Sequence, residues 1–209
     1  MKKPDIELKN AQNVGAKGVH IISLCKITTE RATRLQKQIE DVRKRRTSLL
    51  ESGRATFESL RILWEEYNYF LSLLHKGFLV RQRVVENVTA TVGRAVLAQR
   101  LAAITTYTGT VNYGALGTSN TAPAVGNTQL GAETYRKALS SGTAASNIAY
   151  LENFYTSSEV SGTFEEYGFF IDGTGSANSG QLFNRFTTTT VKSNVESLNV
   201  QSTITISDV

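Results

Sequence analysis

Few residues of this sequence are of a type that could do covalent chemistry. The chain has one cysteine, Cys25, and two histidines, His20 and His75. A thiol nucleophile needs a base beside it and surroundings that lower its pKa. Cys25 instead ends an apolar run that begins at Ile21, and no glycine motif for an oxyanion hole adjoins it. The pattern favours a structural cysteine, and it excludes an intramolecular disulfide and a cysteine and histidine zinc cluster.

The carboxylates Glu165 and Glu166 could in principle supply an acid and a base. Neighbours on a strand point to opposite faces, so these two cannot act on one substrate atom. Asp172 and Gly173 indicate a tight turn, because the alternating acidic residues of a calcium loop are missing. The glycines near Gly114 are not followed by the Lys-Ser or Lys-Thr pair of a phosphate loop. We therefore expect neither enzyme activity nor a cofactor.

Basic residues are concentrated in the first half of the chain. Residues 1–100 hold 19 Lys and Arg against 10 Asp and Glu, whereas residues 101–209 hold 4 against 8. Four consecutive basic residues, from Arg43 to Arg46, could bind nucleic acid. Three of them occupy outer positions of a heptad pattern, which favours a solvated helix face. Nucleic acid is therefore not expected as a partner, although the sequence pI is near 9.3.

The elements that would position these residues change in character near residue 104. Ahead of it, Thr28 and Thr29 supply a helix N-cap, and apolar residues then recur at heptad spacing. Gly53 interrupts the pattern, so either one long helix passes through a stutter or two helices form a hairpin. The predicted oligomerisation seam consists of Leu35, Ile39, Val42, Arg46, Leu49, Phe57, Leu60, Trp64, Tyr67, Leu71 and Leu74.

A seam of this kind predicts assembly. Because apolar heptad positions are buried by other helices, we expect folding and oligomerisation to be coupled. Arg46 is the charged member of the seam. Such a residue sets register or oligomer state at some cost in stability, and a bundled core could pair it with a Glu or an anion.

A third helix is predicted from about Val80 through Ala103, and the strand-forming residues that follow place the boundary there. Its inner face would hold Val84, Val88, Val92, Val96, Leu97 and Leu101. Beyond it, a short helix is predicted near Ala132 to Leu139, among segments with strand periodicity. The predicted strands are Val111 to Leu116, Ile148 to Tyr155, Thr163 to Ile171, Leu182 to Val191 and Leu198 to Ile206.

These elements predict an α+β chain: an N-terminal helical, coiled-coil-like oligomerisation region followed by an antiparallel β-sandwich. We expect an arm at 1–27, the helical region at 28–103 and the β module at 104–209. The aromatic residues of the module are expected in its core rather than on a glycan-binding surface. They are Tyr150, Phe154, Tyr155, Phe164, Tyr167, Phe169, Phe170, Phe183 and Phe186. The longest apolar run is far too short for a membrane span, and no hydrophobic leader is expected.

Several stretches of the second half have the composition and spacing of a known module. They are residues 111–118 (VNYGALGT), 121–123 (TAP), 127–130 (NTQL), 133–138 (ETYRKA) and 160–170 (VSGTFEEYGFF). Together they resemble a module of tailed-bacteriophage virion proteins of the tail-fibre, tail-collar and baseplate type. The resemblance implies no catalytic residues.

The resemblance implies a structural component of a bacteriophage virion, a fibre or connector subunit of the tail, neck or baseplate. Such a protein would be assembled in the host cytoplasm, oligomerise through its helices as a homotrimer, and dock or display its β module. Its partners would be copies of itself and other virion proteins, without a membrane. A glycan-binding host-attachment adhesin that contacts host surface glycan, and a capsid head-fibre or decoration protein, are the alternatives.

Overall fold

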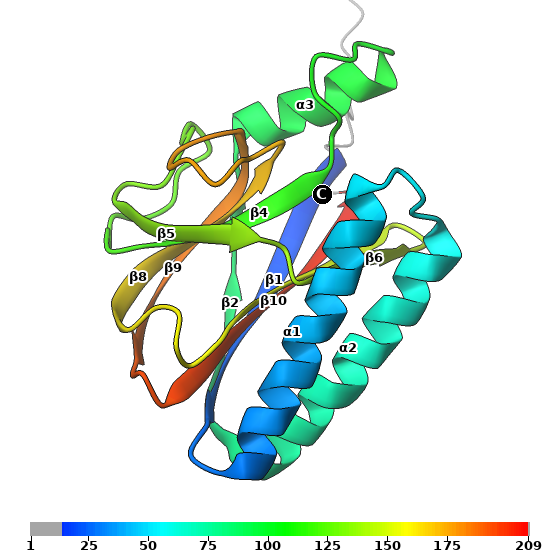
Figure 1. Ribbon diagram of the computed structural model, residues 1–209. Coiled ribbons are helices and arrows are strands. Elements are labelled where there is room, and N and C mark those ends of the chain that lie inside the picture. Colours follow the sequence, from blue (N-terminus) through cyan, green and yellow to red (C-terminus); the bar gives the residue numbers. More distant parts are fainter. Residues whose placement is uncertain (1–13, 209) are drawn as a thin grey trace, which may run out of the picture.

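The computed structural model describes residues 14–208 and contains, over that range, three helices and two antiparallel sheets (Figure 1). The α+β class is therefore confirmed. The helices are α1 (Glu30–Glu51), α2 (Phe57–Phe78) and α3 (Thr91–Leu101). The strands are β1 (Val14–Lys26), β2 (Leu79–Glu86), β3 (Val88–Thr89), β4 (Val111–Gly117), β5 (Glu133–Ala138), β6 (Ser141–Ala145), β7 (Ile148–Tyr155), β8 (Gly162–Ile171), β9 (Gln181–Lys192) and β10 (Glu196–Asp208). Sheet A has the order β2-β1-β10-β7-β6, and sheet B has the order β3-β9-β8-β4-β5.

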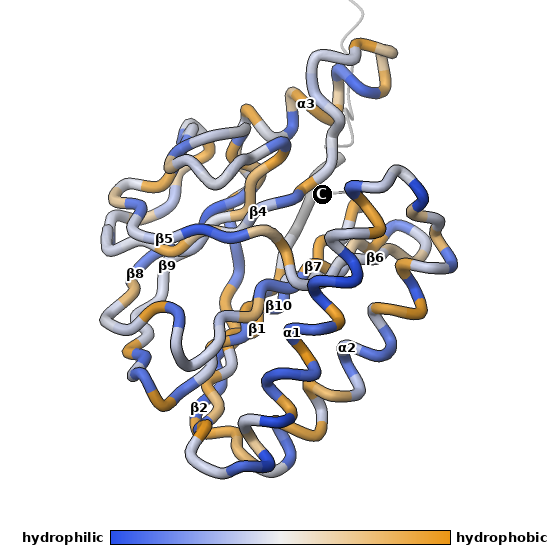
Figure 2. The backbone as a smooth tube through the Cα atoms, in the orientation of Figure 1, coloured by the Kyte–Doolittle hydropathy of each residue, from blue (hydrophilic) through white to orange (hydrophobic). Residues whose placement is uncertain are grey.

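The helices α1 and α2 form a hairpin, which decides between the two alternatives at Gly53. Gly53 has a φ of 67°, a left-handed conformation that suits glycine at the end of a helix. The Thr29 side chain accepts a hydrogen bond from the Ala32 amide and caps α1 as predicted, and Thr56 with Ser59 forms a capping box on α2. Figure 2 shows that hydrophilic positions dominate α1, while hydrophobic positions are denser along α2.

Sheet A is covered on both faces. On one face, Ile22 of β1 and Val200 of β10 share a core with Phe186 of sheet B. On the other face, Cys25 of β1 and Phe154 of β7 lie in a core with the helical hairpin. The hairpin, sheet A and sheet B therefore form successive layers (Figure 1), and α3 lies across one end of the sheets.

The last strand alternates apolar and polar residues, as a half-exposed strand does, but its polar side is not exposed. Leu198, Val200 and Ile204 face sheet B and are buried. Asn199, on the opposite side, is only 1% exposed because α2 covers it. The hydroxyl of Tyr67 on α2 donates a hydrogen bond of 2.8 Å to Asn199 Oδ1.

The strand β1 lies inside sheet A, within the range 1–27 that we expected to form an arm. It pairs with β10 along its whole length, from Val14 opposite Asp208 to Lys26 opposite Glu196. Its other edge pairs with β2. Residues 1–13 of the expected arm lie outside the described part. The helical half and the β half thus share a sheet, and the change in composition near residue 104 does not separate two cores.

The helix predicted from Val80 through Ala103 is wrong over its first part. There the chain forms β2 and β3, and only α3 is helical. β-Branched residues favour strands, and hydrogen bonding places β2 beside β1 in sheet A and β3 beside β9 in sheet B. As a result, Val84 is 66% exposed instead of facing inward. Leu101, which is in the helical part, is also not on an inner face and is 91% exposed.

The short helix predicted near Ala132 to Leu139 is also wrong. This segment is the strand β5, which pairs with β4. The five predicted strands are confirmed, with ends within two residues, whereas β6 was not predicted. Of the nine aromatic residues expected in the core, all but Tyr150 are buried, which confirms the core interpretation.

Candidate functional site

Cys25 and His20, the pair that could have formed a nucleophile and base, lie on opposite faces of sheet A. His20 stacks on Phe186 of sheet B, with ring centroids 3.9 Å apart. Cys25 lies in the core under the helical hairpin. Burial lowers the pKa of His20 to about 3 and raises the pKa of Cys25 to about 12. The thiol is thus protonated at neutral pH, which agrees with a structural cysteine.

Cys25 is expected to resist thiol reagents in the folded protein. The side chain is 1% exposed and its raised pKa keeps the thiolate fraction low at neutral pH. Incubation with a chromogenic disulfide reagent should label no thiol under native conditions and one thiol in concentrated guanidinium chloride. Rapid labelling of the native protein, at the rate of the denatured control, would contradict this burial.

Glu165 and Glu166 point to opposite faces, as predicted. Glu165 accepts a hydrogen bond from the exposed Thr189 hydroxyl, whereas the Glu166 side chain is fully buried. Glu166 Oε2 lies 2.8 Å from Nε of Arg185 on β9. The same carboxylate accepts hydrogen bonds from three backbone amides of the connection between β4 and β5. These donors are the amides of Ser119, Gly131 and Ala132.

Arg185 also binds the backbone of the connection between β4 and β5. Its Nη2 donates to the carbonyl oxygen of Thr121 at 2.9 Å, and its Nη1 donates to the carbonyl oxygen of Ala122 at 3.3 Å. Both ends of the buried ion pair with Glu166 therefore bind the backbone of the segment 118–132. Such charge-assisted hydrogen bonds hold a long surface connection in one conformation.

A second buried ion pair fastens the turn between β8 and β9. Arg136 Nε lies 2.6 Å from Glu133 Oε1, and both side chains are at most 3% exposed. The Arg136 guanidinium also donates to the carbonyl oxygen of Ser179 at 2.9 Å and lies over the ring of Phe170. Asp172, at the start of this turn, accepts a hydrogen bond of 2.7 Å from the Thr108 amide, so it has the turn role expected from the sequence.

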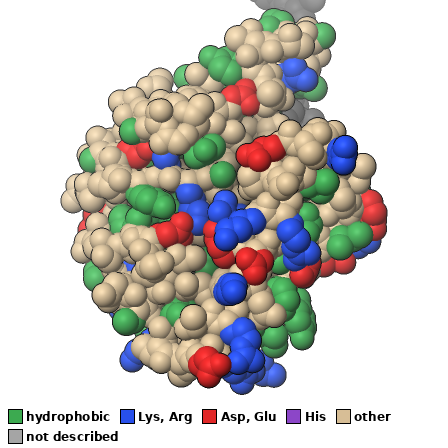
Figure 3. Space-filling model, viewed as in Figure 1, with side chains coloured by type: hydrophobic (Ala, Val, Ile, Leu, Met, Phe, Trp, Pro, Cys, Tyr) green, Lys and Arg blue, Asp and Glu red, His purple; other side chains and the backbone are tan. Residues whose placement is uncertain are grey.

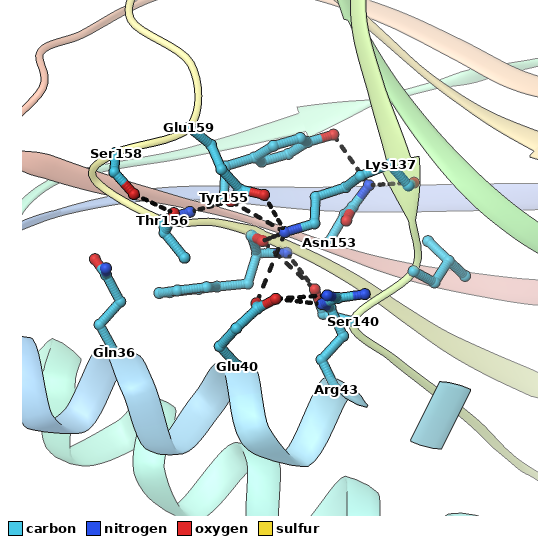
Figure 4. A network of polar contacts seen from close by, with 12 residues as sticks. Gln36, Glu40, Arg43, Lys137, Ser140, Asn153, Tyr155, Thr156, Ser158 and Glu159 are labelled. Carbon is cyan, nitrogen blue, oxygen red and sulfur yellow. Dashed lines mark hydrogen bonds and ion pairs between the residues drawn. The ribbon is translucent and has the colours of Figure 1, made fainter. Parts of the chain in front are cut away.

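A third polar network joins α1 to β5 and the turn after β7. Charged side chains gather on this face of the molecule (Figure 3), and the close view shows their contacts (Figure 4). Lys137 Nζ donates to Glu159 Oε1 at 2.7 Å and to the carbonyl oxygen of Phe154 at 3.0 Å. Glu40 of α1 lies 3.7 Å from the same ammonium and 2.6 Å from Arg43. The lysine is fully paired and links the helical half to the β half.

The predicted oligomerisation seam lies mostly inside the chain. Its buried apolar members pack between the two helices and against Cys25, Ile27 and Phe154. Because the chain's own residues cover them, their burial does not require a second copy. The buried members are Leu35, Ile39, Val42, Arg46, Tyr67, Leu71 and Leu74; Leu49, Leu60 and Trp64 are half-buried, and Phe57 is 63% exposed.

One exposed apolar surface lies on β2, a strand that the sequence analysis assigned to a helix. All residues of β2 except Val85 are exposed. Within the described range β2 pairs only with β1, so its outer edge presents free backbone groups. Val84 lies opposite Ile21 in the register, and the nearby Val19 is 43% exposed. We call Val19, Ile21 and Val84 the β2 patch. Strand periodicity in the valine-rich stretch after Leu79 was the signal that could have revealed it.

Comparison of the chain with protein-family models, curated proteins and solved structures finds no match. Between residues 14 and 208, no cluster of three or more His, Cys, Asp or Glu side chains is placed to bind a metal ion. The helices of the same region are too short or too polar to cross a membrane.

Proposed function

We propose that this protein is a structural subunit of a tailed-bacteriophage virion, a connector or fibre subunit of the tail, neck or baseplate. The likeness of the second half to virion modules motivates the proposal. The observation that carries it is that buried ion pairs hold two surface connections in place. Glu166 and Arg185 bind the connection between β4 and β5, and Arg136 binds the turn between β8 and β9. Fixed connections form a preorganised surface, which lowers the entropy cost of docking to a partner protein.

In this proposal the two sheets form a β-sandwich that serves as a rigid docking module. Phe164, Phe169 and Phe186 of sheet B share one core with Ile22 and Leu198 of sheet A, which supports a sandwich. The helical hairpin then acts as a layer fixed on sheet A, and not as a separate coiled coil.

Self-association, predicted from the heptad pattern, is assigned here to the β2 edge. An open strand edge beside exposed valines is a template for pairing with another chain. Arg81 and Arg83 of β2 add positive charge, whereas the half of the chain after residue 100 carries a net negative charge, so unlike surfaces of two copies attract each other. A contact between two different surfaces closes into a ring when the rotation from copy to copy returns to the first copy, and a homotrimer is one such ring.

The variant Val84→Lys is expected to weaken self-association. The lysine places a charge in the β2 patch and opposes burial against a second copy. Light scattering coupled to size exclusion should give an oligomer mass for the unchanged protein and a shift toward monomer for the variant. The matched control is Val191→Lys, since Val191 is also a strand valine and is 55% exposed. An unchanged protein that is a monodisperse monomer would refute the assignment.

The virion role has its own test, independent of the oligomer mass. Antibodies raised against the purified protein should label assembled phage particles at one axial position in electron micrographs. Labelling of host lysate alone, with none on particles, would exclude the role. Binding to an array of host surface glycans would favour the adhesin alternative.

A further inference from the structure

A cavity of about 510 Å³ lies where the turn end of the helical hairpin, between α1 and α2, meets the ends of both sheets. Its lining comes from distant segments: Leu60 of α2, Leu151 of β7, Phe183 of β9 and Ile204 of β10. In Figure 1 the turn between α1 and α2 and the end of β10 lie at the same end of the molecule. The volume is within the range of small-molecule sites, and apolar walls of this kind take up an apolar ligand.

Arg46 is the charged residue among those that line the cavity. It is 8% exposed, and its Nη1 donates a long hydrogen bond of 3.3 Å to the carbonyl oxygen of Leu139. Its buried Nε has no hydrogen-bond partner, and no carboxylate within 4.0 Å pairs with it, among the described residues. The other buried arginines, Arg136 and Arg185, each face a carboxylate. Arg46 differs because none of the described carboxylates faces it.

Burying a cation without a partner costs free energy. The surroundings of Arg46 limit which kind of anion could pair with it. Burial lowers the pKa of Arg46 to about 10, so the guanidinium stays charged at neutral pH. A guanidinium offers five N–H donors in a planar fork that matches a carboxylate. The remaining lining offers mainly apolar side chains, with hydroxyls from Thr110 and Thr143. A ligand with one negative charge and an apolar body fits this lining, whereas a peptide would also bring backbone groups that need polar partners.

We propose that this cavity binds an apolar monocarboxylate, such as a medium-chain fatty acid, with the carboxylate on Arg46 and the chain against Leu60, Leu151 and Ile204. This inference is independent of the virion role. The sequence analysis placed Arg46 in the seam and gave two possible partners for it, a Glu or an anion. In this proposal the partner is an anion that comes from outside the chain. Gly142 provides room for the guanidinium, because a Cβ there would lie 3.0 Å from Arg46 Nη2.

The test is calorimetric titration of the full chain, stripped of lipid, with dodecanoate. We expect saturable binding near one ligand per chain. Loss of the charged hydrogen bonds in Arg46→Met should weaken binding roughly ten- to hundredfold. The control Arg45→Met removes the same charge one residue away, where the side chain is exposed and pairs with Glu66, and should bind as the unchanged protein does. Uncharged methyl dodecanoate should bind as weakly to the unchanged protein as dodecanoate binds to Arg46→Met.

Unfolding measurements keep the test decisive. Replacing an unpaired buried charge by an apolar side chain of similar length is expected to leave stability unchanged or raise it without ligand, so Arg46→Met should fold. Dodecanoate should raise the melting temperature of the unchanged protein and not that of Arg46→Met. Equal binding to both proteins, or no binding to either, would overturn the proposal. Binding of trileucine through its terminal carboxylate, without binding of dodecanoate, would overturn it in favour of a peptide terminus.

Discussion

Replacement of Glu166 by alanine is expected to lower the free energy of unfolding by about 3–5 kcal/mol, the usual cost of removing one partner of a buried ion pair. Arg185 would remain buried without its carboxylate, since its side chain is 3% exposed. Three backbone amides of the connection between β4 and β5 would also lose their acceptor. Urea unfolding followed by circular dichroism measures the loss, and hydrogen exchange at the Gly131 and Ala132 amides should become faster.

The adjacent residue supplies the control for this prediction. Glu165→Ala removes the same charge from the same strand, but Glu165 bonds only to an exposed hydroxyl among the described residues. Its effect should stay within about 0.5 kcal/mol, as for most surface substitutions. Equal losses in the two variants would show that the ion pair of Glu166 and Arg185 is not what holds the connection.

Stability is expected to fall as the pH rises between about 4.5 and 7, through the ionisation of Glu152. This carboxyl lies buried between sheet A and α2, and burial raises its pKa from 4.5 to about 7, although hydrogen bonding by Gln201 and Asn68 acts in the opposite direction. Between these two pH values the folded protein binds the proton and the unfolded chain does not. The contribution of Glu152 to the free energy of unfolding is therefore fully present below the pKa of the unfolded chain. It is lost as the pH rises through the pKa of the folded protein, and the loss is about 3 kcal/mol.

The variant Glu152→Gln isolates this contribution. Glutamine keeps the shape without a charge, so the variant should be more stable than the unchanged protein near pH 8, by up to about 3 kcal/mol, and similar to it near pH 4. His20 changes the stability with pH in the opposite direction. Its pKa is lowered to about 3, so its contribution to the free energy of unfolding is lost as the pH falls below 6.5. Because the unchanged protein and Glu152→Gln both contain His20, its contribution cancels in the difference between their free energies of unfolding. A pH-independent difference would contradict the prediction.

The sequence predicts half of the strands and the first two helices because their patterns are local. Alternation from Leu198 to Ile206 and heptad spacing from Leu35 to Leu74 each define an apolar face of the correct period. A pattern does not show what covers that face, however. The seam suggested other helices, and the chain supplies Phe154 and Cys25 of sheet A for much of it.

The errors and omissions come from contacts between distant residues. Val80, Val84, Val88 and Val92 recur every four positions, which suggested a helix, but pairing of β2 with β1 overrode that spacing. The buried charges could not be placed either, because each depends on a partner far along the chain. Nothing in the sequence near Lys137 points to Glu40, and nothing near Glu166 points to Arg185.

The pairing of β1 with β10 sets the order in which the molecule can form. During synthesis on the ribosome, Ser23 emerges long before its partner Asn199, and β2 borders β1 on one side only. The hairpin of α1 and α2 can close early, but most of its supporting sheet arrives with β7 and β10. Contacts of such high sequence separation slow folding. Until β10 arrives, the nascent chain exposes an open strand and the apolar side of the hairpin to chaperones and to neighbouring nascent chains.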